Sequence, residues 1–188
     1  MSTCLVGSEM CIRDRGGHNV TVFNRTKTKA EKWISDHKGK MAETPAEAAK
    51  DADYVFTCVG NDNDLREVTF GEKGIFKTIK KGAVYIDNTT ASATIAREIY
   101  DYAKKNGFGS LDAPVSGGVS GAEQATLTIM VGGKKNTYND AKEILNVLGK
   151  NIIYVGKSGS GQIVKACNNM MLGINMIGVS EAFTLARK

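Results

Sequence analysis

The sequence has few of the residues that build metal sites and disulfide frameworks. It contains 2 histidines and 4 cysteines in 188 residues, and the cysteines show no C-x-x-C spacing. We therefore expect no metal site and no disulfide framework, and reduced thiols in a cytoplasmic protein are the default expectation. No apolar run reaches membrane-spanning length, and residues 1–15 lack the basic-then-apolar order of a signal peptide, so no membrane association is expected.

The sequence also lacks a basic cluster. Its formal net charge of +5 comes from 25 basic and 20 acidic residues spread along the chain, without lysine- and arginine-rich stretches interleaved with aromatic residues. No nucleic-acid partner is therefore expected, and an anionic cofactor or substrate accounts for local positive charge equally well. The apolar share of 41% and charged share of 24% are typical of a globular protein with one main core.

Strand-like and helix-like segments alternate along most of the chain. Short β-type runs occur at residues 20–23, 54–59, 83–86, 109–113, 127–131 and 152–155, with helical patterns at 27–39, 94–106 and 137–148. Such crossovers are what parallel strands need, so the alternation predicts an α/β fold with a doubly wound, Rossmann-type parallel sheet. A long helix is expected from residue 161 to the end. Because ligands bind beyond the carboxyl ends of the strands in such sheets, we expect one crevice there.

One segment near the C-terminal end has the pattern of a catalytic helix. GSGQIVKACNN at residues 159–169 opens with two glycines and then presents Lys165 and Asn169. Residues four apart lie on one face of a helix, so the ammonium and the amide would point into the same space. A lysine there can stabilise charge on a substrate oxygen and transfer a proton, while an asparagine orients the substrate. For this pair in isolation, a surface lysine on an ordinary helix is the alternative.

Two motifs together carry a resemblance to a known family. DAPVSGGVSGAEQATLTIMVGG at residues 112–133 and GSGQIVKACNN are both long and specific. Through them, the chain resembles the β-hydroxyacid dehydrogenases, which include 3-hydroxyisobutyrate dehydrogenase and tartronate semialdehyde reductase, from about residue 16 to residue 188. The resemblance implies hydride transfer between a nicotinamide cofactor and a small 3-hydroxy acid or its semialdehyde. It also implies Lys165 as the general acid/base and Asn169 as a substrate-orienting residue.

The resemblance assigns binding residues as well. Ser116, Gly117 and Gly118 are expected to bind the substrate, since glycine backbone N–H groups can approach a carboxylate closely. The expected cofactor-binding residues are Asn24, Arg25, Thr26, Val59, Gly60, Asn61 and Thr90, with Thr90 near the nicotinamide. A strand-end carboxylate would bind a ribose 2′-hydroxyl, whereas an arginine suits a 2′-phosphate. Arg25 without a carboxylate beside it favours NADP over NAD, unless Arg25 is merely a solvated charge. Asp62 and Asp64 are interpreted as turn and cap residues.

Both ends of the sequence depart from the family pattern. Residues 1–15 hold only Gly7 where the family has a strand and a GxGxxG-type turn. We interpret these residues as a non-native N-terminus that replaces the first strand, the phosphate turn and most of the first helix; a divergent native N-terminus is the alternative. Residues 16–158 are the expected dinucleotide-binding domain, and 159–188 the catalytic segment and the start of an interdomain helix. The strongly apolar stretch 163–186 indicates that an all-helical C-terminal domain is missing and that the chain is a fragment.

Two other functions compete with this reading. A 6-phosphogluconate dehydrogenase is less favoured, because that group places histidine before the asparagine, where this chain has Cys167-Asn168-Asn169. A non-catalytic dinucleotide-binding module tends to lose the lysine that is present here at Lys165. That module, or an inactive fragment of the enzyme, stays a reasonable description of the polypeptide itself. The expected partners are a small hydroxy acid or semialdehyde and, for the full-length protein, further copies of itself.

Overall fold

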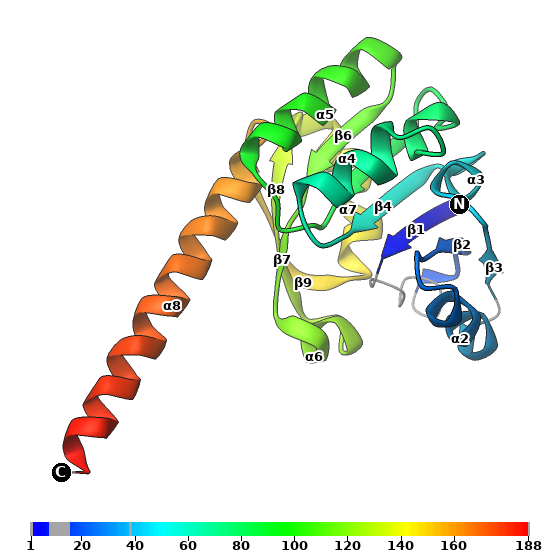
Figure 1. Ribbon diagram of the computed structural model, residues 1–188. Helices are drawn as coiled ribbons and strands as arrows, with labels where there is room; N and C mark the ends of the chain where they lie inside the picture. The colour runs from blue at the N-terminus through cyan, green and yellow to red at the C-terminus, as the bar shows by residue number, and fades with distance from the viewer. Residues whose placement is uncertain (1, 8–15, 38, 188) are drawn as a thin grey trace.

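The computed structural model describes residues 2–7, 16–37 and 39–187 of the chain. The described residues contribute nine strands to one sheet in the order β3-β2-β1-β4-β5-β6-β8-β7, with β9 paired to β8 (Figure 1). The strands are β1 (Ser2–Gly7), β2 (Asn19–Phe23), β3 (Lys40–Met41), β4 (Tyr54–Cys58), β5 (Val84–Asp87), β6 (Gly109–Asp112), β7 (Val115–Ser116), β8 (Leu127–Gly133) and β9 (Gly149–Gly156). The helices are α2 (Lys27–His37), α3 (Pro45–Ala49), α4 (Asp62–Phe70), α5 (Ala93–Asn106), α6 (Gly118–Glu123), α7 (Lys135–Asn146) and α8 (Ser160–Ala186), with a 3-10 turn η1 (Ile75–Lys77).

The predicted doubly wound α/β fold is confirmed, although the sheet is mixed rather than wholly parallel. Within the group β1 to β6, each pair of neighbouring strands is parallel. Strand β8 runs antiparallel to both β6 and β7, and β9 runs parallel to β8. The reason lies in the connection, because residues 117–126 between β7 and β8 hold only the short helix α6. A parallel return needs a longer crossover, so this segment turns the chain back on itself.

Strand β1 lies in the middle of the sheet, where it pairs in parallel with β2 on one side and β4 on the other (Figure 1). A first strand is therefore present, so the expectation that it is missing is wrong, whereas the non-native origin of residues 1–15 stays a prediction. A central strand covered on both faces reads as a continuous apolar run without alternation, and Cys4-Leu5-Val6 in the sequence has that form. The predicted loss of the phosphate turn and of most of the first helix concerns residues 8–15, which lie outside the described residues.

Helices cover both faces of the sheet, and neighbouring strand residues point to opposite faces. Val55 of β4 and Tyr85 of β5 pack in the cluster with α3, α4 and α5. Phe56 and Ile86, the next residues along, pack in the cluster with α2 and α7. This alternation follows from the period of two in a strand. The loops that follow the parallel strands β2, β4 and β5 lie at one common edge of the sheet, the carboxyl edge.

Helix α8 begins against the sheet and then extends away from the rest of the molecule (Figure 1). Its buried residues are Gly161, Gln162 and Lys165, all near its start. Farther along, large apolar side chains are exposed, from Met170 (65%) to Phe183 (66%). An exposed apolar surface of this kind is what the composition of residues 163–186 predicts. Among the described residues, no helix combines the length and apolar character that a membrane crossing requires.

Candidate functional site

A cavity of about 680 Å³ lies beyond the carboxyl ends of β2 and β4. Its lining contains five of the predicted cofactor residues: Asn24, Arg25, Thr26, Val59 and Gly60. This is the position at which doubly wound sheets bind nucleotides. The structure therefore brings together five of the seven residues that the sequence analysis assigned to the cofactor. Asn61 and Thr90 lie outside the lining that the described residues form.

An ion pair joins two residues of the cavity lining, Arg25 and Asp64. Nη1 of Arg25, after β2, lies 3.3 Å from Oδ1 of Asp64 on α4. Asn61 caps α4 by accepting hydrogen bonds from the backbone N–H groups of Asn63 and Asp64, and its Nδ2 donates to Oδ2 of Asp64 at 3.2 Å. Sequence reasoning saw Asp64 only as a turn or cap residue, because nothing in the spacing connects it with Arg25. The fold supplies from α4 the carboxylate that the end of β2 lacks.

Thr90 is exposed on the loop that follows β5, and its neighbour Thr89 anchors that loop. Oγ1 of Thr89 accepts a hydrogen bond from the backbone N–H of Val59 at 3.1 Å. The backbone N–H of Thr89 donates to Oδ1 of the buried Asp87 at 3.0 Å. The loop is thereby fixed to the residue that follows β4 and to the end of its own strand.

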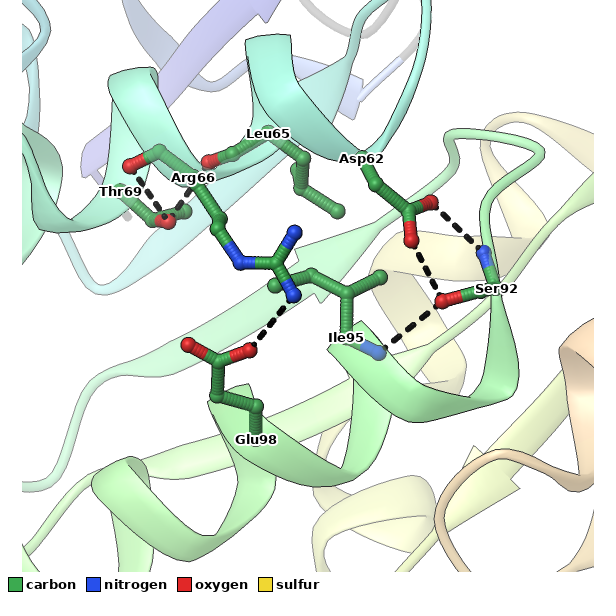
Figure 2. Close-up of polar contacts among 7 residues, drawn as sticks. All are labelled: Asp62, Leu65, Arg66, Thr69, Ser92, Ile95 and Glu98. Atoms are coloured by element: carbon green, nitrogen blue, oxygen red, sulfur yellow. Dashed lines mark hydrogen bonds and ion pairs between the residues drawn. The ribbon is translucent and has the colours of Figure 1, made fainter.

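The far end of the loop is fixed by a contact between α4 and α5, shown in Figure 2. Ser92 donates its backbone N–H and its hydroxyl to the two carboxylate oxygens of Asp62, at 2.8 and 2.5 Å. Arg66 adds an ion pair of 2.9 Å with Glu98. Burial raises the pKa of Asp62, but the hydrogen bonds from Ser92 and the charge of Arg66 outweigh it, so the pKa lies below its ordinary value. Asp62 therefore acts as a structural anchor, in line with its interpretation from the sequence.

Asp87 and Asp112 are buried carboxyl groups on neighbouring strands, paired in register between β5 and β6. Oδ1 of Asp87 accepts hydrogen bonds from the hydroxyl of Thr57 at 2.9 Å and from the Thr89 backbone. Burial, with a smaller contribution from the nearby Asp112, raises the pKa of Asp87 to about 7 in spite of these bonds. Sequence reasoning did not identify either residue, since a strand-end aspartate in an apolar run carries no distinctive spacing.

Asp112 fixes the start of helix α8. Its Oδ1 accepts the backbone N–H of Gly159 at 2.8 Å and its Oδ2 accepts that of Gln162 at 3.2 Å. A carboxylate at a helix N-terminus satisfies unpaired N–H groups and suits the helix dipole. Burial raises the pKa of Asp112 against these hydrogen bonds. Gly161 allows the close contact, because a Cβ there would collide with the carbonyl oxygen of Met130 and lie 2.8 Å from Oδ2 of Asp112.

Lys165 lies one turn beyond this anchor and is only 9% exposed. Burial lowers the pKa of Lys165, and no charged group among the described residues contributes to that shift. Asn169, four residues later on α8, is exposed, and its Oδ1 accepts a hydrogen bond from Nδ2 of Asn168 at 3.4 Å. The predicted helical spacing of Lys165 and Asn169 is confirmed, whereas their chemical roles stay predictions.

The predicted substrate residues occupy the turn from β7 into α6. Ser116 ends β7, opposite Thr128 of β8, and is partly buried. Gly117 and Gly118 have φ values of +136° and +63°, which side-chain-bearing residues rarely adopt. The described residues place neither this turn nor Lys165 in the lining of the cavity. The two motifs instead meet through Asp112, the first residue of the substrate motif.

Two family models match the chain. Residues 4–156 match the NAD binding domain of 6-phosphogluconate dehydrogenase, and residues 159–188 match the NAD-binding region of NADP-dependent 3-hydroxyisobutyrate dehydrogenase. The chain belongs to the β-hydroxyacid dehydrogenase family. The resemblance inferred from the two motifs is thereby confirmed.

Individual β-hydroxyacid dehydrogenase relatives agree with this assignment. An uncharacterized oxidoreductase of Shewanella frigidimarina is 43% identical over 171 residues, which cover 91% of this chain and 59% of the relative. The mitochondrial 3-hydroxyisobutyrate dehydrogenase of Drosophila melanogaster is 41% identical over 172 residues, covering 92% and 52%. The solved structure of Mycobacterium tuberculosis 3-hydroxyisobutyrate dehydrogenase with L-serine is 34% identical, with a TM-score of 0.90, covering 100% of this chain and 65% of that one. The chain thus spans about half the length of the curated relatives it matches.

Proposed function

We propose that this chain provides the coenzyme-binding domain and the catalytic lysine of an NAD(P)-dependent dehydrogenase. The reaction would interconvert a small 3-hydroxy acid and its semialdehyde. The observation that carries the proposal is the position of Lys165, buried on α8 one turn beyond the point where Asp112 of the substrate motif fixes that helix. Relatives named 3-hydroxyisobutyrate dehydrogenase support the same substrate class.

Lys165 would act as the general acid/base. In the reducing direction its ammonium group gives a proton to the alkoxide oxygen of the substrate, and in oxidation its neutral amine accepts the proton of the alcohol. The lowered pKa of Lys165 favours the second role, because a larger fraction of the amine is neutral near pH 7. A bound nicotinamide supplies the hydride acceptor or donor.

The remaining predicted residues would orient the two ligands. The backbone N–H groups of Gly117 and Gly118, with the hydroxyl of Ser116, would bind the substrate carboxylate, and Asn169 would orient the reacting carbon. The glycine conformation at both positions supports this role, since it exposes consecutive N–H groups to a ligand. Thr90, on its anchored loop, would face the nicotinamide.

NADP is the favoured coenzyme in this proposal. Arg25 lines the cavity at the end of β2, where a 2′-phosphate would lie, and Lys29 adds a second cation to the lining. Asp64 opposes this preference by pairing with Arg25. Further acidic side chains line the same cavity, namely Glu43, Glu67 and Glu72. We therefore expect NADP to be preferred while NAD is still accepted.

The test is oxidation of NADPH and of NADH in the presence of a panel of small semialdehydes. Residues 1–188 would be joined to the C-terminal part of the Drosophila relative, so that the chain has the length of its relatives. Activity that Lys165→Ala abolishes without loss of folding or coenzyme binding supports the proposal. Lys157→Ala is the matched control, because this exposed lysine lies just before α8. A folded enzyme that binds NADPH but reduces nothing, with Lys165→Ala silent, would leave a dinucleotide-binding module as the function.

A second candidate is that the 188-residue polypeptide itself binds a dinucleotide without catalysis. It is favoured by the exposed apolar side chains of α8, which lie directly beyond the catalytic segment. A chain that binds NADPH alone, and turns over substrate only when joined to the rest of a relative, would establish this division of roles.

A further inference from the structure

The side chain of Gln162 joins helix α8 to the loop that carries Thr90. It is only 3% exposed. Its Nε2 donates to the carbonyl oxygen of Thr89 at 2.7 Å, and its Oε1 accepts the backbone N–H of Ala91 at 3.0 Å. Only one orientation of the amide satisfies both contacts, because a flipped amide would place oxygen against oxygen and N–H against N–H. The amide is therefore hydrogen-bonded to the backbone on both sides of Thr90.

The other anchors of this loop come from elsewhere in the fold. Thr89 is hydrogen-bonded to Val59, the residue after β4, and Ser92 is hydrogen-bonded to Asp62 of α4. Within the part of the chain that the structure describes, the side-chain hydrogen bonds between this loop and α8 are those of Gln162. Without them, the loop would stay attached to the coenzyme half of the sheet but not to the catalytic helix.

Gln162 is itself held in place by the anchor that orients α8. Its backbone N–H donates to Oδ2 of Asp112, and Lys165 follows three residues later on the same helix. Thr90 and Lys165 are thus linked through one buried side chain. Hydride transfer and proton transfer need fixed relative positions of coenzyme, substrate and acid/base, and small displacements cost rate.

We propose that Gln162 is a positioning residue. It fixes the position of the Thr90 loop relative to Lys165, so that the nicotinamide half of the coenzyme is held beside the catalytic helix. This inference rests on the proposed function, because it takes Thr90 to face the nicotinamide. Gln162 touches neither coenzyme nor substrate in this arrangement. Its effect passes through the backbone of Thr89 and Ala91.

The experiment compares the binding of two nucleotides to the 188-residue chain and its variants. 2′,5′-ADP contains only the adenosine half of the coenzyme, whereas NADPH adds the nicotinamide half. Gln162→Met keeps the length of the side chain and removes both hydrogen bonds, leaving two buried backbone groups unpaired. NADPH affinity should fall roughly tenfold and the emission enhancement of the bound dihydronicotinamide should be lost, while 2′,5′-ADP affinity changes by less than about twofold. Gln162→Glu, nearly identical in shape, should show the same selective loss, because it places an oxygen opposite the Thr89 carbonyl.

Ser158→Ala is the matched control for a general loosening of α8. Oγ of Ser158 donates to the carbonyl oxygen of Ala96 at 3.1 Å, so this variant removes a hydrogen bond between the approach to α8 and α5 without touching the loop. Ser158→Ala should not lower the affinity for one nucleotide more than the affinity for the other. Equal losses for both nucleotides in the Gln162 variants, or an unchanged NADPH affinity and emission, would overturn the positioning role. A wild-type chain that binds neither nucleotide would instead refute the proposed function from which the inference starts.

Discussion

The backbone N–H of Gly159 donates a hydrogen bond of 2.8 Å to Oδ1 of Asp112, which joins two segments that lie far apart in the sequence. Asp112 begins the motif that contains the predicted substrate turn, and Gly159 begins the motif that contains Lys165. One buried carboxylate thus fixes the two motifs relative to each other. The position of Lys165 depends on Asp112 as much as on the helix that carries it.

Asp112→Ala should therefore destabilise the fold. Loss of the carboxylate leaves the N–H groups of Gly159 and Gln162 unpaired in a buried place, which should lower the free energy of unfolding by roughly 1–3 kcal/mol. Urea denaturation followed by circular dichroism measures this. Asp101→Ala, an exposed aspartate on α5, is the control and should stay within about 0.5 kcal/mol of wild type. Equal urea midpoints for Asp112→Ala and Asp101→Ala would contradict the anchoring role of Asp112.

Asp64→Asn should raise the preference for a 2′-phosphate. The change removes a negative charge 3.3 Å from Arg25, so the guanidinium is free to bind the phosphate. Because the pair is partly exposed and worth only about 0–1 kcal/mol, the affinity ratio of 2′,5′-ADP to 5′-ADP should rise a few-fold in calorimetric titrations. Arg25→Ala should lower the same ratio.

Glu72→Gln is the control for this effect. Glu72 lines the same cavity but is exposed, so its substitution changes the net charge equally. If Glu72→Gln shifts the ratio as much as Asp64→Asn does, the cause is the overall charge of the cavity and not the contact with Arg25.

Asp87 should make the folded chain less stable as the pH rises from about 4 to about 7. Its pKa is about 7 in the folded chain against an ordinary value of 3.8. Between these values the folded chain holds a proton that the unfolded chain has released, so this stabilisation is complete below the lower pKa and lost above the higher one. The expected slope is a decrease of up to about 1.4 kcal/mol per pH unit.

Asp87→Asn should flatten this profile, because the amide does not titrate. The measurement is the free energy of unfolding in urea at about pH 5 and about pH 7.5. The raised pKa of Asp112 acts in the same direction and leaves a residual slope. An identical profile for wild type and Asp87→Asn would show that Asp87 ionises normally in the folded chain.

Gly118→Ala should cost about 1–2 kcal/mol of stability for conformational reasons alone. Gly118 has a φ of +63°, yet a Cβ added there would meet no atom within 4 Å, so crowding plays no part. Gly118→Asn should cost less, since asparagine tolerates the left-handed region better. Thermal denaturation of both variants tests this, and equal melting temperatures for alanine and asparagine would refute the conformational explanation.

Much of the fold could be predicted because its signals are local. Threonine followed by proline is a local signal for a helix start, and Thr44, just before Pro45, does accept the backbone N–H of Glu47 at the start of α3. The strand-end position of Arg25 and Gly60 likewise follows from where two apolar runs stop. Such features depend on neighbouring residues, so a pattern in the sequence is sufficient to find them.

The contacts that organise the site could not be predicted, because they join segments with no sequence relation to each other. Asp64 on α4 pairs with Arg25, 39 residues earlier in the chain, and Gln162 reaches the loop around Thr90 only after α8 has docked. A glutamine inside an apolar helix carries no signal of its own. Strand β1 was missed for the opposite reason, since the continuous apolar run Cys4-Leu5-Val6 has no period to detect.

Helix α8 contains 27 residues and is therefore about 40 Å long, yet only its first turns are packed. These packed turns act as the nucleus of the helix, because the fold has already fixed their backbone dihedral angles. In an isolated helix, ordering those angles makes nucleation unfavourable. Beyond them, each residue adds its hydrogen bond with little help from the described part of the chain. Amide protection should therefore decline from Lys165 toward Ala186, and on warming the helix should shorten from its outer end before the sheet unfolds.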